Sequence, residues 1–302
     1  MRDWAIPLQN EPIWRRRRAG ARPAVAAVSA PFGRDVQAGL NQIERIVSRA
    51  RRRGAELVVL PEAALGGYLF EPVMPGTRTS VAPPPQLSID GPEIERLARI
   101  AGETVVCAGY TEAAPGGRYS SAVCVSGDGV LGHQRKVHLP PGEKGQFLAG
   151  GGFAAFDTPV GRMGMLVCYD KVFPEAARDL SLDGAGIIAS LAAWPVCRAR
   201  PATRTKHDRQ VEQFNLLDRT RALENQVIWA SANQCGRLGR LRFPGQAKVV
   251  DPHGRVLAST GTRAGTAIAR VDVPGSLGAA RHEFSHLGDR MPSAYRASVA
   301  AA

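Results

Sequence analysis

The chain has 302 residues, 44% of them hydrophobic, so it is long enough to bury a large core in one or two domains. Its formal net charge is +12, with 39 lysines and arginines against 27 aspartates and glutamates. No apolar run approaches the roughly 20 residues that a membrane span requires. These properties exclude a membrane-spanning protein and predict a soluble globular one.

The cysteines are odd in number and far apart, and no two of them form a CxxC pair: Cys107, Cys124, Cys168, Cys197 and Cys235. This pattern predicts neither a disulfide framework nor a thiolate metal cage. We therefore expect a reducing compartment, and specifically the cytoplasm.

Two arginine runs, Arg15–Arg18 and Arg51–Arg53, concentrate positive charge that could contact nucleic acid or acidic lipid. No aromatic interleaving or nucleic-acid motif accompanies them, so we expect neither nucleic acid nor a membrane as a partner. Arg51–Arg53 instead suit the C-terminal end of a helix. We predict a loosely ordered extension over residues 1–22 and, because no linker interrupts the rest, a single domain over residues 23–295.

The first predicted elements lead to a carboxylate. Ala24–Ser29 reads as a buried strand, and Asp35 can cap a following helix that buries one face: Leu40, Ile43, Val47 and Ala50. Leu57–Leu60 is a second buried strand, which ends at Pro61 and Glu62. Catalytic groups of α/β proteins often lie just past the carboxyl end of a strand, although Glu62 could equally cap the next turn.

A Gly- and Pro-rich stretch, residues 66–90, predicts a long loop that shields these strand ends. One helix and three strands are predicted next, the last two strands joined by a Gly-Asp-Gly hairpin turn: Pro92–Ala101, Thr104–Tyr110, Tyr119–Val125 and Val130–Arg135. Lys136 follows the last strand, and Glu143 lies in the loop beyond it. Most other cations are arginine, so the proximity of Lys136, Lys144 and Lys171 indicates a need for a compact ammonium.

Cys168 lies where a short apolar strand, Met163–Val167, meets a helix whose first turn can accept Pro174. A thiol at such a turn faces backbone N–H groups and the positive end of a helix. These conditions favour a thiolate and could hold an oxyanion. The segment alone leaves two interpretations open: Cys168 is a nucleophile, or it is a small buried apolar residue.

Strands and helices continue to alternate toward the C-terminus. The pattern predicts a helix to Leu182, strands at 185–190, 227–233, 246–250, 256–259 and 266–271, and a helix at 207–224. Hairpins and βα units in one chain are typical of a layered α/β sandwich.

Three segments, in this order, make the chain resemble the nitrilase superfamily of carbon-nitrogen hydrolases. VVLPEAALGGY resembles the family's glutamate motif, HQRKVHLPPGEKGQF its lysine motif and MLVCYDKVFPEAAR its cysteine motif. The flanking segments SLAAWP, RALENQVIWASANQCG and GQAKVVDPHGRVLAS match as well. The likeness covers residues 23–295. It implies an α/β fold of four layers, the αββα sandwich, in which protomers pair through their outer helices, so a homodimer or larger homo-oligomer is expected.

The resemblance assigns roles to the residues that match the motifs. Glu62 would be the general base and Cys168 the nucleophile that forms a thioester. Lys136 and the backbone N–H of Tyr169 would stabilise the oxyanion. Glu143 would position the substrate or Lys136, unless it only forms a salt bridge with Lys136 or Lys144. No metal or organic cofactor is implied.

Substrate contacts are expected from five further residues: Tyr68, Tyr169, Asp170, Lys171 and Trp194. Family nitrilases tend to carry Cys-Trp-Glu at the nucleophile, whereas this chain has Cys-Tyr-Asp, as in amidases and carbamoylases. The expected substrate is therefore a linear amide or N-carbamoyl compound. Lys171 could hold a substrate carboxylate, or it could simply pair with Glu175. Trp194 would form an apolar wall.

Four alternatives remain. An amine instead of water could resolve the thioester, which would make the protein an amide-forming or acyl-transfer enzyme. It could hydrolyse nitriles, or it could be a relative that has lost catalysis. Finally, His282–His286 reads HEFSH, which matches the HExxH zinc pattern of metallohydrolases. Only Asp289 follows as a possible further ligand, so we expect no zinc site.

Overall fold

The computed structural model describes residues 22–68 and 83–295. Within these ranges the strands are β1 (Ala24–Ala30), β2 (Ala55–Val59), β3 (Val105–Ala114), β4 (Gly117–Ser126), β5 (Gly129–Arg135), β6 (Phe156–Thr158), β7 (Gly161–Val167), β8 (Ile187–Ala192), β9 (Ile228–Leu238), β10 (Leu241–Pro244), β11 (Lys248–Val250), β12 (Val256–Ser259) and β13 (Gly265–Arg270). The helices are α1 (Val36–Arg52), α2 (Pro92–Ala101), α3 (Pro174–Leu182), α4 (Arg209–Asn225) and α5 (Val273–Glu283). A 3₁₀ turn, η2 (Cys168–Val172), joins β7 to α3.

The early elements form for the reasons that the sequence indicates. The carboxylate of Asp35 accepts the N–H of Ala38 and so caps α1, whose predicted apolar face is buried. The hairpin between β4 and β5 pairs Ser126 with Gly129, as predicted. Two short strands, β6 and β10, were not predicted, because three or four residues carry too little periodicity to be recognised.

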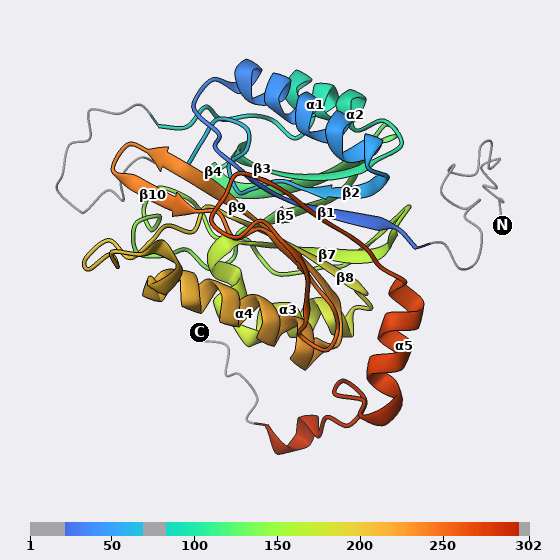
Figure 1. Ribbon diagram of the computed structural model, residues 1–302. Helices are drawn as coiled ribbons and strands as arrows, with labels where there is room; N and C mark the ends of the chain where they lie inside the picture. The colour runs from blue at the N-terminus through green and yellow to red at the C-terminus, as the bar shows by residue number, and fades with distance from the viewer. Residues whose placement is uncertain (1–21, 69–82, 296–302) are drawn as a thin grey trace.

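The strands belong to one sheet with the order β5-β4-β3-β2-β1-β9-β8-β7-β6, and this sheet folds over on itself. Helices α1 and α2 cover one outer face, while α3 and α4 cover the other (Figure 1). Three buried clusters fill the three interfaces: the two between helices and sheet, and the one where the halves of the sheet face each other. The fold is the αββα sandwich that the family resemblance implies.

The strand directions bring the motif residues to one end of the sandwich. β1, β2 and β3 run parallel, and β9, β8 and β7 continue in the same direction. Two antiparallel pairings, β3 with β4 and β4 with β5, return β5 to that direction as well. Glu62 follows β2, Lys136 follows β5 and Cys168 follows β7, so all three lie beyond carboxyl ends of strands.

Several predictions concern residues outside the described ranges. The N-terminal extension, except Arg22, and most of the loop predicted at 66–90 lie there. The division into an extension and one domain over 23–295 therefore stays a prediction. None of the described helices is long and apolar enough to cross a membrane.

Candidate active site

A lysine between two glutamates forms the centre of the site. Lys136 Nζ donates to Glu62 Oε1 at 2.8 Å and to Glu143 Oε1 at 2.7 Å, and all three side chains are buried. Burial opposes the charge of Lys136, but Glu143 and Glu62 outweigh it and hold the pKa of Lys136 well above its usual value. Burial also raises the pKa of Glu143, against the effect of the ammonium. The ammonium is therefore fixed in place by two acceptors.

Glu62 is held by further donors that sequence reasoning missed. The backbone N–H of Ala193 donates to Glu62 Oε2 at 2.9 Å, and the Ser120 hydroxyl donates to Oε1 at 3.2 Å. Ala193 belongs to the flank SLAAWP, in which the family resemblance assigned a role only to Trp194. Asn233, in another matching flank, accepts the N–H of Trp194 and donates to its carbonyl, so it fixes the loop after β8.

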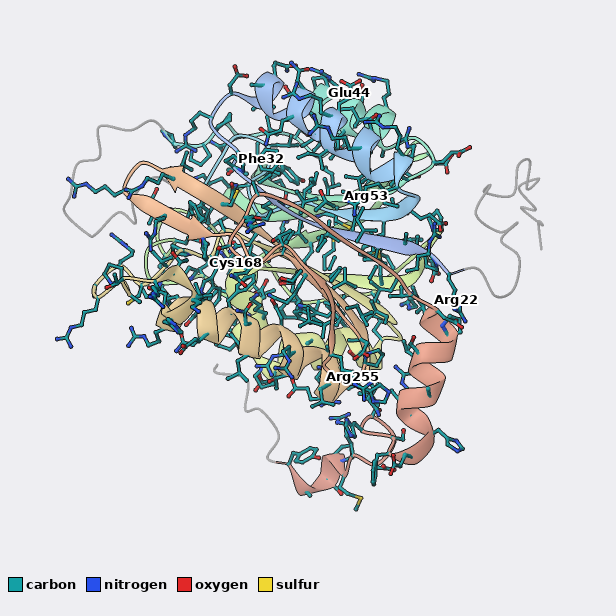
Figure 2. All side chains as sticks on the ribbon, viewed as in Figure 1. Arg22, Phe32, Glu44, Arg53, Cys168 and Arg255 are labelled. Atoms are coloured by element: carbon teal, nitrogen blue, oxygen red, sulfur yellow. The ribbon has the colours of Figure 1, made fainter. Side chains whose placement is uncertain are left out.

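Cys168 begins the 3₁₀ turn η2 with φ +50°, a left-handed conformation that is strained for any residue with a Cβ. It is only 6% exposed, and Figure 2 shows it between the two helical layers. Burial and the charge of Glu62 raise the pKa of Cys168 well above its usual value, although Lys136 and a hydrogen bond from the Ala193 N–H act against them. Burial and Glu62 thus oppose the ionisation that the position of Cys168 at the turn was expected to favour.

Asp170 was expected to contact the substrate, and this expectation is wrong. Its side chain is fully buried, and Oδ1 accepts the N–H groups of Val137 and His138 at 3.2 and 2.8 Å. Oδ2 accepts the N–H of Val167 at 3.2 Å. Asp170 therefore ties the loop that carries Lys136 to the turn that carries Cys168.

Lys171 takes neither of its predicted roles, substrate binding or pairing with Glu175. Its ammonium is fully buried, 2.7 Å from Asp218 Oδ1 and 3.2 Å from the centroid of the Phe214 ring. Lys248 reaches the other oxygen of Asp218 at 2.5 Å. Burial, opposed by Asp218, lowers the pKa of Lys171 to about 8. The alternation of the chain could not reveal this pairing, since Asp218 lies 47 positions along the sequence.

A cavity of about 370 Å³ opens beside Cys168. Three predicted substrate contacts line it: Tyr68, Tyr169 and Trp194. Its other walls are mostly apolar, apart from two polar side chains: Pro140, Pro141, Gly142, Ala193, Pro195, Leu241, Arg198 and Gln210. Arg198 and Gln210 were not anticipated, because they lie in an irregular loop and a helix start without a recognisable motif.

Two buried polar atoms close to the cavity have no hydrogen-bond partner among the described residues: Glu143 Oε2 and Trp194 Nε1. The other oxygen of Glu143 accepts both Lys136 and the hydroxyl of Tyr68, the latter at 2.5 Å. An unpaired buried acceptor and an unpaired buried donor are costly unless a ligand completes them. The arrangement suits a ligand that offers an N–H and an acceptor.

The HEFSH segment does not form the single helix that an HExxH zinc site needs. Helix α5 ends at Glu283, and Phe284 has extended backbone, so His286 lies beyond the helix that contains His282. The N–H of His286 instead donates to Gln226 Oε1 at 2.9 Å. Within the described part of the chain, no three histidine, cysteine or acidic side chains are grouped as metal ligands.

Comparison with known proteins identifies relatives along most of the chain. A nitrilase from Pyrococcus abyssi is 33% identical over 240 residues, which cover 77% of this chain and 83% of that protein. An N-carbamoylputrescine amidase from Solanum lycopersicum is 27% identical over 292 residues, 90% of this chain and 93% of its own. The solved complex of an amidase variant from Nesterenkonia sp. AN1 with butyramide matches with a TM-score of 0.72 at 25% identity, and covers 91% of this chain and 96% of that one.

The family model described as carbon-nitrogen hydrolase matches residues 24–280. This range contains every strand and helix from β1 to β13 and most of α5. It also contains the three motifs that the sequence suggested. The protein is therefore an enzyme of the carbon-nitrogen hydrolase family, within the nitrilase superfamily.

Proposed function

We propose that this enzyme hydrolyses a linear amide or an N-carbamoyl compound through a thioester at Cys168. The observation that carries the proposal is the position of Lys136, fixed between Glu62 and Glu143 next to a strained cysteine at the end of an apolar cavity. A base, a nucleophile and a cation for the oxyanion are thus together.

In the first half of the reaction, Cys168 Sγ bonds to the substrate carbonyl carbon while Glu62 takes the thiol proton. Because burial raises the pKa of the free thiol, proton transfer accompanies this attack. The oxyanion is stabilised by the Lys136 ammonium and the N–H of Tyr169. The C–N bond then breaks, and the leaving nitrogen takes the proton from Glu62.

In the second half, Glu62 removes a proton from water, and the resulting hydroxide attacks the thioester carbonyl. The C–S bond breaks, the acid leaves and the proton returns to Cys168. Glu143 Oε2, which has no partner among the described residues, accepts an N–H of the substrate amide. Its other oxygen holds Lys136 in position.

The cavity supports a small or medium substrate. Its volume of about 370 Å³ and its apolar walls suit a short aliphatic or flat acyl group. The dipeptide Tyr169–Asp170 after the nucleophile favours an amide over a nitrile. One relative is named for the linear compound N-carbamoylputrescine, and an amidase variant with a similar structure was solved in complex with the linear amide butyramide. The described cysteines are free thiols, which supports the predicted cytoplasmic setting.

The test is ammonia release from a panel of primary amides, N-carbamoyl compounds and nitriles, combined with mass spectrometry of the protein. We expect amide or carbamoyl turnover, and a protein mass increased by the acyl group during turnover. Cys168→Ala should abolish both, and Cys168→Ser should reduce turnover by several orders of magnitude, since a hydroxyl ionises far less readily than a thiol. Turnover by the alanine variant would overturn the proposal. Faster turnover of nitriles than of every amide would overturn the substrate class.

Added hydroxylamine or an amine tests acyl transfer. Hydrolysis requires that the free acid be the main product in water. Preferential formation of the amide product at low amine concentration would show that transfer, not hydrolysis, is the function.

A further inference from the structure

A second cavity, of about 740 Å³, lies next to the first and is lined by four arginines. Arg198 belongs to the loop between β8 and α4, while Arg237, Arg240 and Arg242 belong to the β9–β10 hairpin. Figure 1 shows the hairpin and the start of α4 on the same side of the molecule. A backbone hydrogen bond from Val196 to Arg242, 2.9 Å long, joins the two segments. The cavity is therefore built by both.

Arg198 lines both cavities, so they share one wall. The first cavity contains Cys168, and among the described residues that line either cavity there is no carboxylate. A ligand whose reacting carbonyl is at Cys168 can extend past Arg198 toward the second cavity. The charged side chains that line the second cavity are all arginines, so they would repel a distal amine on that ligand and attract a distal anion.

Three of the four arginines have no acidic partner among the described residues. Arg198, Arg237 and Arg242 form no ion pair with a residue that the structure describes. The nearby carboxylate of Asp208 is fully buried and already accepts the N–H groups of Cys197, Ala202 and Gln210. It thus shapes the loop and does not neutralise the arginines. Guanidinium groups that converge without acidic partners repel one another, and a bound anion removes this repulsion.

We propose that this cavity, which we call the arginine cavity, binds an anionic group at the far end of the substrate. The proposal rests on the proposed function and narrows its substrate class to amides or N-carbamoyl compounds that carry a carboxylate or phosphate remote from the scissile bond. Lys171 was one possible contact for a substrate carboxylate, but it is buried with Asp218, whereas Arg198 lines the cavity that contains Cys168. The cavity's volume of about 740 Å³ suits a small anion.

The test compares matched amides that differ in the charge at the far end. Succinamate, glutaramate and adipamate carry a carboxylate, butyramide, valeramide and hexanamide are neutral, and 4-aminobutyramide carries an ammonium. We expect at least one anionic amide to have the highest kcat/KM and the cationic amide the lowest. Arg198→Gln and Arg242→Gln should each reduce the ratio of anionic to neutral kcat/KM by about tenfold or more, the usual effect of losing a charged hydrogen bond.

Arg255→Gln is the matched control, because it removes the same charge from an exposed arginine distant from the cavities (Figure 2). It should leave the ratio unchanged. Raising the salt concentration should reduce the preference in the wild type. A ratio that Arg198→Gln and Arg242→Gln leave unchanged, while neutral amides are hydrolysed, would overturn this proposal and leave the proposed function intact.

The binding of glutarate and of inorganic phosphate to the wild type can be measured by calorimetry without turnover. This measurement distinguishes a carboxylate site from a phosphate site. We expect one of the two anions to bind and the affinity to fall in Arg198→Gln. Absence of binding by both, together with a flat substrate series, overturns the proposal. A third outcome is that a short RNA binds through these arginines while the enzyme shows no preference for anionic amides. This would overturn the proposal, because the ligand of the arginine cavity would then be a polyanion and not the substrate. If no amide of any charge is hydrolysed, the proposed function fails, and the calorimetry decides the anion site separately.

Discussion

Lys136 shows how a single buried charge can organise a site. Its ammonium has two carboxylates as neighbours, so the group as a whole carries excess negative charge inside the protein. Burial first, and then the charge of Glu62, raise the pKa of the Cys168 thiol, which gives a base the role of removing its proton during attack. The residues around Cys168 therefore determine at which step of the reaction its thiol loses the proton.

Replacing Lys136 with arginine should abolish activity even though the charge is kept. The ammonium fits between acceptors 2.7 and 2.8 Å away in a fully buried space, and a planar guanidinium cannot direct one donor to the same point. We expect kcat to fall by at least about 100-fold, the effect of losing an oxyanion donor. The control is Lys144→Arg, at an exposed lysine in the same loop. Full kcat in Lys136→Arg would remove Lys136 from the oxyanion site.

Glu62→Gln should separate the ionisation of Cys168 from its reactivity with substrate. The charge of Glu62 raises the pKa of Cys168, so the amide variant should have a lower thiol pKa and should react with iodoacetamide at lower pH. Turnover should nevertheless fall by about 100-fold or more, because an amide cannot accept the thiol proton. Glu44→Gln, on the exposed face of α1, is the control. An unchanged turnover would show that Glu62 is not the base.

At the scale of elements, buried polar groups hold the catalytic loops together. Asp170 connects the end of β5 with the start of η2 through three backbone N–H groups. One residue further on, Lys171 connects η2 to α4 through Asp218, and Lys248 adds β11 to the same carboxylate. Asp170 and Lys171, two of the five residues that were expected to contact the substrate, thus position the turn that carries Cys168.

Asp218, Lys171 and Lys248 form one buried charged group, which we call the Asp218 group. Substitutions of Asp218 and of Lys171 should lower the free energy of unfolding by different amounts. Asp218→Asn leaves two buried ammoniums without a counter-ion and should lower the free energy of unfolding by roughly 3–5 kcal/mol. Lys171→Met leaves the pair of Asp218 and Lys248 intact and should cost less. Chemical denaturation at pH 7 measures both. A larger loss in Lys171→Met than in Asp218→Asn would contradict this account.

The same group predicts a pH dependence. The pKa of Lys171 is lowered from 10.5 to about 8 in the folded protein, so between these values the unfolded chain holds a proton that the folded chain has lost. The contribution of Lys171 to the free energy of unfolding therefore rises with pH through this window, by up to roughly 3 kcal/mol. The difference in stability between wild type and Lys171→Met should shift in favour of the wild type from pH 7 to pH 10. A constant difference would show that Lys171 keeps its usual pKa.

At the scale of the whole molecule, large apolar side chains remain exposed on one side of the sandwich. They belong to α3, α4 and the segment after α5, which covers the end of the α3–α4 layer only in part (Figure 1): Leu182, Leu216, Leu223, Phe284, Met291 and Tyr295. Leu216 is 65% exposed, and Leu223 on the same helix is 45% exposed. Exposed apolar side chains that recur along one helix are typical of an interaction surface.

We expect these residues to be covered by a second copy of the chain, so the protein should be a dimer or larger. Light scattering at micromolar concentration should give a multiple of 32.2 kDa. Leu216→Arg should shift the mass toward the monomer, whereas Val256→Arg, at an exposed position on β12, should not. A single monomeric mass for the wild type would contradict the prediction.

The sequence alone determined most of the elements and which residue types can react. Periodicity and capping predicted α1, α2 and most strands, because these depend on neighbours within a few positions. The order of the glutamate, lysine and cysteine motifs indicated the family, because each motif combines a strand end with a reactive side chain.

Only the tertiary structure decided what each polar side chain contacts. Asp170 and Lys171 follow the nucleophile directly, yet their partners come from β5, its following loop, and α4, so their structural roles could not be inferred from adjacent sequence. The ionisation of Cys168 depended on burial and on Glu62, 106 positions earlier in the printed sequence. The arginine cavity joins two segments about 40 residues apart, and local pattern contains no information on contacts at that separation.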